Sequence, residues 1–118
     1  MAYNPSQGYV AINKAGDTFT GPITTTGKKA AYRSVSANTS IAATDEHIEI
    51  TGTSAVTVTL PDAAANNKAV FNIKNSSTAT ATIATTSSQI IDGATTFSLG
   101  IQYQAITVIS NGSGWSIF

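Results

Sequence analysis

The sequence predicts an all-β protein: a small antiparallel β-sandwich or jelly-roll-like body preceded by an extended N-terminal arm. Its 118 residues include nineteen threonines, many of them alternating with valine, isoleucine or alanine, and β-branched side chains fit a pleated strand better than a helix. Short alternating runs, separated by turn residues, follow one another from about residue 36 at spacings typical of a sandwich. The chain has no cysteine, so packing, backbone pairing or association with other subunits must stabilise it.

The predicted strands are 47–51, 55–60, 69–75, 79–84, 96–99, 105–110 and 114–118. Apolar and polar residues alternate in these runs, so every second side chain is expected to face the core. The inward positions of the first four are Ile48, Ile50, Val56, Val58, Leu60, Phe71, Ile73, Ala81 and Ile83. Pro61 ends the second strand, and the pair Asp92-Gly93 predicts a turn before the strand at 96–99.

Two connections have a specific expected shape. The segment DAAANNK at 62–68 contains three alanines, but it is too short to be a stable helix alone, so we expect a single turn. The segment NGSG between the last two strands is a hairpin signal, in which Asn111 and Gly112 should adopt positive φ angles. The last two strands should therefore pair and hold Trp115, with Phe118, as an anchor in the body or between subunits.

Residues 1–35 are predicted to form the arm and residues 36–118 the body. The stretch NKAGDTFTGPI at 13–23 contains two glycines and a proline and has no hydrophobic period, which excludes a helix and a buried strand. We interpret it as a connector between the body and the structure on which the body stands. Its attachment residues are Asn13, Lys14, Gly16, Asp17, Phe19, Gly21, Pro22 and Ile23.

Charge and hydropathy indicate which partners to expect. Six Lys and Arg residues balance six Asp and Glu residues, and charged residues make up 10% of the chain, so no nucleic-acid partner is predicted. No apolar run approaches the roughly 18 residues of a membrane span. The first ten residues, MAYNPSQGYV, lack the basic and apolar regions of a signal peptide. We therefore expect synthesis in the cytoplasm and no membrane insertion.

The sequence offers little for catalysis. His47 is the one histidine; it stands near Asp45 and Glu46 and shares a strand face with Glu49, which would suit metal ligands. A solvated strand start is the more ordinary interpretation. No GxSxG, P-loop or dinucleotide-binding glycine pattern is present. We expect no enzyme activity, no metal and no cofactor.

Two aromatic residues raise the question of sugar binding. Trp115 and Tyr103 have flat apolar rings with a polar edge, which suit stacking on carbohydrate. A lone tryptophan in a terminal strand is more often a core or interface anchor, and that is the interpretation we favour for Trp115.

The stretch NKAGDTFTGPI resembles the short repeat of tail-fibre and related virion proteins of tailed bacteriophages, Asn-Lys-x-Gly-Asp-x-Met/Phe-x-Gly-Pro-Ile/Leu. The body also resembles phage fibre and appendage domains, through the strand VTVTLP, the strand ending in IKN, and the C-terminal segments SQIIDGATTFSL and AITVISNGSGWSIF. The chain departs from a typical fibre in having a single repeat and a single body, where a fibre has a long shaft with many repeats.

This resemblance implies a non-enzymatic structural protein on the virion surface, a short homotrimeric tail fibre or fibre tip that contributes to host attachment. An alternative is a capsid decoration (cement) or head-fibre protein that clamps and stabilises the shell, and a third is a free sugar-binding module. The implied partners are two further copies of the chain, other tail or capsid proteins through the arm, and host surface carbohydrate. Trimerisation has its own physical argument, since a small sandwich must cover its open edge strands.

Overall fold

The computed structural model describes residue 27 and residues 29–118, and this part of the chain is all β. It contains nine strands and no helix. The strands are β1 (Tyr32–Val35), β2 (Thr39–Ser40), β3 (His47–Ile50), β4 (Val56–Leu60), β5 (Val70–Asn75), β6 (Ala81–Thr85), β7 (Thr96–Leu99), β8 (Ala105–Ser110) and β9 (Trp115–Ile117). All seven predicted strands are present to within two residues at either end. The predicted attachment residues at 13–23 lie outside the described residues.

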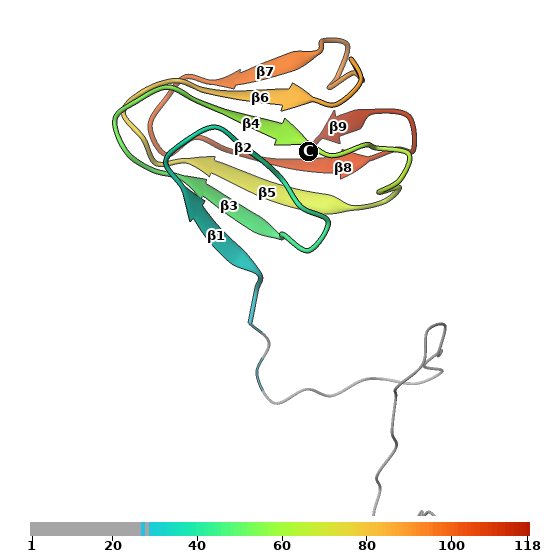
Figure 1. The fold of residues 1–118 in the computed structure, drawn as a ribbon, viewed down its shortest axis with the longest axis horizontal. Coiled ribbons are helices and arrows are strands. Elements are labelled where there is room, and N and C mark those ends of the chain that lie inside the picture. Colours follow the sequence, from blue (N-terminus) through green and yellow to red (C-terminus); the bar gives the residue numbers. More distant parts are fainter. Residues whose placement is uncertain (1–26, 28) are drawn as a thin grey trace, which may run out of the picture.

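The nine strands form two sheets that pack face to face (Figure 1). Sheet A has five strands in the order β1-β3-β5-β8-β9, and sheet B has four in the order β2-β4-β6-β7. The all-β, two-layered body is therefore as predicted. Alternation of apolar and polar residues explains it, because each sheet directs one apolar face at the other and leaves its second face outside.

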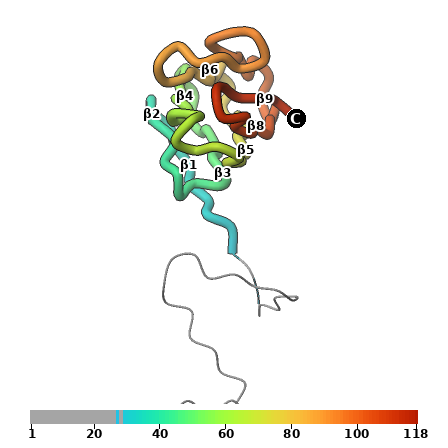
Figure 2. Tube along the Cα trace, turned by 90° about the vertical axis from the view of Figure 1, so that its right-hand side faces the viewer, coloured from blue at the N-terminus to red at the C-terminus, as the bar shows by residue number. Residues whose placement is uncertain are grey.

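The strand pairing differs from the prediction. From β1 to β6 successive strands alternate between the two sheets, and within each sheet they pair in parallel: β1 with β3, β3 with β5, β2 with β4, and β4 with β6. The chain thus winds as a two-sheeted coil with one strand per sheet in each rung, rising from β1 to β6 in Figure 2.

The prediction of an antiparallel sandwich is wrong for this coil, for a physical reason. Parallel neighbours need a long crossover connection, which in most folds contains a helix. Here the crossover from β3 to β5 contains β4 of the opposite sheet. The apolar pattern predicts where strands occur, but it does not predict to which sheet each belongs.

The C-terminal part of the chain is antiparallel. β7 returns beside β6, β8 lies beside β5, and β9 pairs with β8. The predicted pairing of the last two strands is therefore confirmed. The predicted turn before β7 is also confirmed, since Asp92 and Gly93 both have positive φ angles and the backbone groups of Ile91 and Ala94 bond to each other in both directions.

The prediction for the β8–β9 loop is confirmed in part. Gly112 has a φ of +92°, but Asn111 is not among the residues with positive φ. The Asn111 side chain instead closes the loop, because its Oδ1 accepts hydrogen bonds from the N–H groups of Ser113 (3.1 Å) and Gly114 (2.9 Å). Gly114 is required by close approach: a Cβ there would lie 2.6 Å from the Ile90 carbonyl oxygen.

The core between the sheets is continuous and apolar. Its buried residues are Val35, Ile41, Ile48, Ile50, Val56, Val58, Leu60, Ala63, Phe71, Ile73, Ala81, Ile83, Ile91, Leu99, Val108 and Trp115. Every inward position predicted from the first four strands is in this set. The Trp115 ring is 1% exposed and packs on Phe71 with ring centroids 5.6 Å apart, so it is an anchor of the body. Its indole N–H has no hydrogen-bond partner among the described residues.

Segment 62–68 forms a turn without helix, as predicted. The Asn66 N–H donates to the carbonyl oxygens of Asp62 (3.1 Å) and Ala63 (3.3 Å). The buried Ser110 hydroxyl of β8 donates to the Ala63 carbonyl oxygen at 2.6 Å, which fastens this turn to sheet A.

The first rung of the coil is closed by a charged side chain. Arg33 of β1 donates to the Asp45 carboxylate at 2.7 Å, to the Thr39 hydroxyl at 3.1 Å and to the Ser40 carbonyl oxygen at 3.1 Å. Thr39 and Ser40 belong to β2, so Arg33 ties sheet A to sheet B at the open end of the coil. A solenoid needs a polar end of this kind. β1 is thus part of the folded body, although residues 32–35 fall in the range predicted for the arm.

Candidate binding face on sheet A

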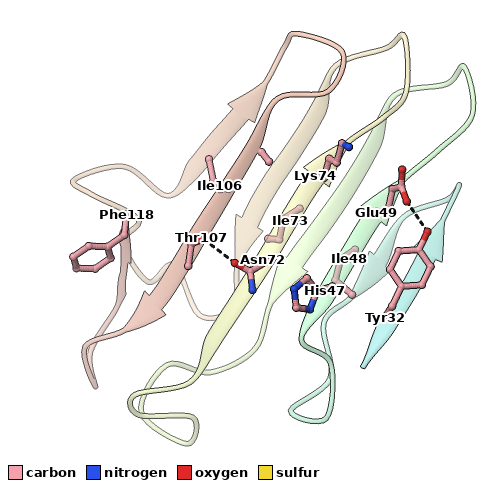
Figure 3. A pocket seen from close by; sticks show the side chains of 11 residues that line it. Tyr32, His47, Ile48, Glu49, Asn72, Ile73, Lys74, Ile106, Thr107 and Phe118 are labelled. Carbon is pink, nitrogen blue, oxygen red and sulfur yellow. Dashed lines mark hydrogen bonds between the residues drawn. The ribbon is translucent and has the colours of Figure 1, made fainter. Parts of the chain in front are cut away.

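Five side chains lie in one row across the outer face of sheet A. The strand register pairs Tyr32 with His47, His47 with Asn72, and Asn72 with Thr107. The Phe118 N–H donates to the Thr107 carbonyl oxygen at 2.9 Å, which adds Phe118 to the end of the row. We call Tyr32, His47, Asn72, Thr107 and Phe118 the transverse row. Figure 3 shows its two aromatic rings at opposite ends with the three polar side chains between them.

The row follows directly from the pleat of the strands. Side chains of a strand alternate between its two faces, and in β3 and β5 the isoleucines and Phe71 point into the core. The intervening residues of both strands must then face outward. The spacing between neighbouring strands is about 4.8 Å, so four steps separate Tyr32 from Phe118 by roughly 19 Å.

The aromatic ends of the row are exposed. Tyr32 is 60% exposed and Phe118 is 78% exposed, so Phe118 is not an anchor buried in the body as Trp115 is. Neither ring contributes its full apolar surface to the core, and exposed aromatic rings beside polar side chains are typical of a contact surface.

The Tyr32 ring is held in place by hydrogen bonds. Its hydroxyl donates to Glu49 Oε2 at 2.5 Å, and the Ser76 hydroxyl donates to Glu49 Oε1 at 2.6 Å. The hydrogen bonds from Ser76 and Tyr32 lower the pKa of Glu49, and the hydrogen bond to Glu49 raises the pKa of Tyr32. The phenol therefore stays protonated and the carboxylate ionised at neutral pH, so the bond that orients the ring persists.

The polar centre of the row has unused hydrogen-bonding capacity. The Thr107 hydroxyl donates to Asn72 Oδ1 at 2.7 Å, so the Asn72 amide nitrogen, with both of its hydrogens, points away from Thr107 (Figure 3). No hydrogen bond of the Asn72 amide nitrogen or of the His47 ring occurs within the described part of the chain. These groups and the Thr107 oxygen can donate to or accept from a ligand.

A hollow of about 350 Å³ lies over this face and includes the whole transverse row in its lining, a size in the range of small-ligand sites. The row contains no Lys, Arg, Asp or Glu. The neighbouring positions contribute one acidic and one basic side chain, Glu49 and Lys74. The Lys74 ammonium lies 5.5 Å from the centre of the Tyr103 ring. The lining of the hollow thus has polar side chains but no net charge from its Lys and Glu.

The metal hypothesis for His47 receives no support from the geometry. His47 and Glu49 do share the outer face of β3, as the alternation predicts, but Glu49 is engaged by Tyr32 and Ser76. Among residue 27 and residues 29–118, no group of three or more His, Cys, Asp and Glu side chains is placed to hold a metal ion. The same residues include no helix long and apolar enough to cross a membrane.

Trp115 and Tyr103, whose rings would suit sugar stacking, lie outside the transverse row. Trp115 is buried in the core, and Tyr103 is 64% exposed but lies in the β7–β8 connection, outside the transverse row. Tyr32, Asn72 and Thr107 were not predicted as site residues. The outward positions of Asn72 and Thr107 were readable from the alternation, but Tyr32 lies in the range predicted for the arm, and the alignment of all three depends on the register of three pairings, two of them parallel.

The outer face of sheet B has a different character. Its outward positions are Ser40, Thr57, Thr59, Thr82, Ala84, Thr96 and Ser98. None of them is charged, aromatic or larger than threonine. Such small side chains allow close approach of another β surface.

No family model, curated protein or solved structure matches this chain.

Proposed function

We propose that this protein is a non-enzymatic surface protein of a tailed-bacteriophage virion, a short trimeric tail fibre or fibre tip that contributes to host attachment. The observation that carries the attachment role is the transverse row, because a small all-β body that exposes two aromatic rings on a face without net charge presents a contact surface. The resemblance of NKAGDTFTGPI to the phage fibre repeat supports the virion assignment. The arm joins the body to the particle.

The trimeric state is supported by the outer face of sheet B. Copies that meet through its small Thr, Ser and Ala side chains bring no like charges together. Three bodies would then display three transverse rows, so that modest single contacts combine into high avidity.

The trimer is tested by placing a charge on this face. Thr82→Glu puts a carboxylate on each copy at the contact, and we expect light scattering to change from the mass of three chains to that of one. Ala105→Glu is the matched control on sheet A, opposite Lys74, and should remain trimeric. A single-chain mass for the unaltered protein would refute the trimer.

The virion assignment is tested by immunogold electron microscopy with antibodies raised against the purified chain. Gold at the tail of purified particles is the expected result. Gold over the capsid would instead establish the decoration or head-fibre alternative, and particles without gold would refute both. A variant lacking residues 1–29 should fold and yet be absent from particles.

A further inference from the structure

We propose that the outer face of sheet A is a binding site for an uncharged glycan, which lies across the strands along the transverse row. Tyr32 and Phe118 stack on sugar rings at its two ends, and His47, Asn72 and Thr107 hydrogen-bond to hydroxyl groups between them. This inference rests on the proposed function for its biological role, but the binding itself is a property of the purified chain.

The chemistry of the row selects this class of ligand. Sugar hydroxyls both donate and accept hydrogen bonds, which matches the free Asn72 amide hydrogens, the His47 ring and the Thr107 oxygen. The C–H faces of sugar rings are apolar and pack on exposed aromatic rings. Because one ring cannot touch both Tyr32 and Phe118 across roughly 19 Å, the ligand is an oligosaccharide rather than a single sugar.

The absence of net charge on the face argues for an uncharged glycan. Nucleic acids and sulphated or phosphorylated polymers bind through rows of Lys and Arg, and the transverse row contains neither. Lys74 is the one basic residue in the lining of the hollow, and Glu49 of the adjacent strand lies directly opposite it in the register. An anionic ligand would meet that carboxylate, which Ser76 and Tyr32 keep ionised.

A peptide in extended form fits the face less well. β3, β5 and β8 are interior strands of sheet A, with neighbours on both sides, so their backbone groups are used in the sheet. A peptide strand adds to an exposed edge, which in sheet A means β1 or β9 and not the transverse row. The face therefore offers side chains alone to its ligand.

The Tyr32 ring is set for stacking before any ligand arrives. Its bond to Glu49, and the bond of Glu49 to Ser76, hold the ring at the end of the row. A preorganised ring loses little conformational freedom on binding, which favours recognition by stacking.

The test begins with the purified full-length chain on an array that contains uncharged, sialylated and sulphated oligosaccharides. We expect uncharged linear glycans to bind, and the strongest of them is then titrated by calorimetry. Tyr32→Ala and Phe118→Ala should each weaken binding about tenfold, and Asn72→Ala should weaken it at least as much. Tyr103→Ala is the matched control, since it removes an equally exposed ring outside the row, and should bind like the unaltered chain.

Several outcomes would overturn the inference. One is binding of sulphated or sialylated glycans alone, and another is no binding by any glycan at millimolar concentration. Equal losses in Tyr103→Ala and Tyr32→Ala would move the site elsewhere. If Tyr32→Ala or Phe118→Ala changes the mass from trimer to single chain, the face is a subunit interface. If the variant without residues 1–29 binds glycan much more tightly, the arm is the natural occupant.

Failure of this inference is distinguishable from failure of the proposed function. Gold at the phage tail with no glycan bound by the purified chain would refute the glycan site alone. Glycan binding that depends on the transverse row, by a protein absent from virions, would refute the virion assignment alone.

Discussion

Replacing Asn75 should destabilise the body more than any change to a polar residue on its surface. Asn75 ends β5 and is 0% exposed. Its amide nitrogen donates to the carbonyl oxygens of Ala79 (2.9 Å) and Leu99 (2.8 Å), and its Oδ1 accepts from the Ser77 N–H (3.0 Å). Leu99 belongs to β7 of sheet B, so this one side chain shapes the β5–β6 connection and joins the two sheets.

The magnitude follows from the three bonds. Each buried hydrogen bond contributes roughly 0.5–1.5 kcal/mol net, and removing one partner leaves the other unpaired, so Asn75→Ala should lower the free energy of unfolding by about 2–5 kcal/mol. Asn75→Asp keeps the shape but replaces the two donor hydrogens with an oxygen that faces two carbonyl oxygens. It should lower the free energy of unfolding by still more, because a buried charge without a partner is costly.

The assay is urea unfolding followed by Trp115 fluorescence at one protein concentration, because subunit association would otherwise shift the midpoint. Asn72→Ala is the matched control, since Asn72 is in the same strand but faces outward, and it should cost less than about 1 kcal/mol. Two results would contradict this role of the Asn75 side chain: an Asn75→Ala variant as stable as Asn72→Ala, or an Asn75→Asp variant more stable than Asn75→Ala.

Three further predictions concern the core, the open end and the arm. Trp115→Ala should lower the free energy of unfolding by about 3–5 kcal/mol. Trp115→Phe should lower it much less, because it removes an indole N–H that has no partner in the described structure. Equal losses in the two variants would contradict the placement of Trp115 in the core. Arg33→Ala should cost about 1–2 kcal/mol in urea unfolding, allowing for solvent screening of its partly exposed ion pair. Burial alone would raise the pKa of Asp45, but hydrogen bonds from Arg33 and the Ala42 N–H lower it below 3.8. The stability contributed by the Arg33–Asp45 ion pair is therefore present above pH 3.8 and is lost as the pH falls through the lowered pKa. An identical midpoint of acid unfolding in Arg33→Ala would contradict this. Removing residues 1–29 should leave the melting temperature nearly unchanged, and removing residues 1–35 should lower it because β1 is lost; equal melting of the two variants would show that β1 adds nothing to the body.

The strands and their inward positions were predictable because they depend on local alternation. The apolar core residues of β3, β4, β5 and β6 all stand at every second position of their strands. The apolar face of a strand is decided by its own sequence, whichever strand lies beside it.

The coil was harder to predict because its repeat is weak. The second and third rungs are offset by 25 residues in both sheets, as the pairs His47 with Asn72 and Val56 with Ala81 show. Ile48 and Ile73 match at this spacing, but Leu60 aligns with Thr85. The first rung is shorter, with Tyr32 paired to His47, so no constant period marks the sequence.

The binding face and Asn75 depend on the tertiary fold. The transverse row forms because three pairings bring residues from distant parts of the chain into line. Asn75 reads in the sequence as the end of a strand before a turn, and its contact with β7 becomes visible only when the two sheets are in place. The boundary of the arm was misplaced for the same reason, since β1 becomes a strand through its pairing with β3.

We propose that this protein stands on a virion with the outer face of sheet A free to contact the host. A three-dimensional cryo-electron microscopy reconstruction of particles that contain this chain tests it most directly. We expect three bodies around a three-fold axis at the tail, in contact through sheet B, with Tyr32 and Phe118 facing solvent. A particle without the protein, or bodies whose sheet A is buried against the shell or against each other, would contradict it.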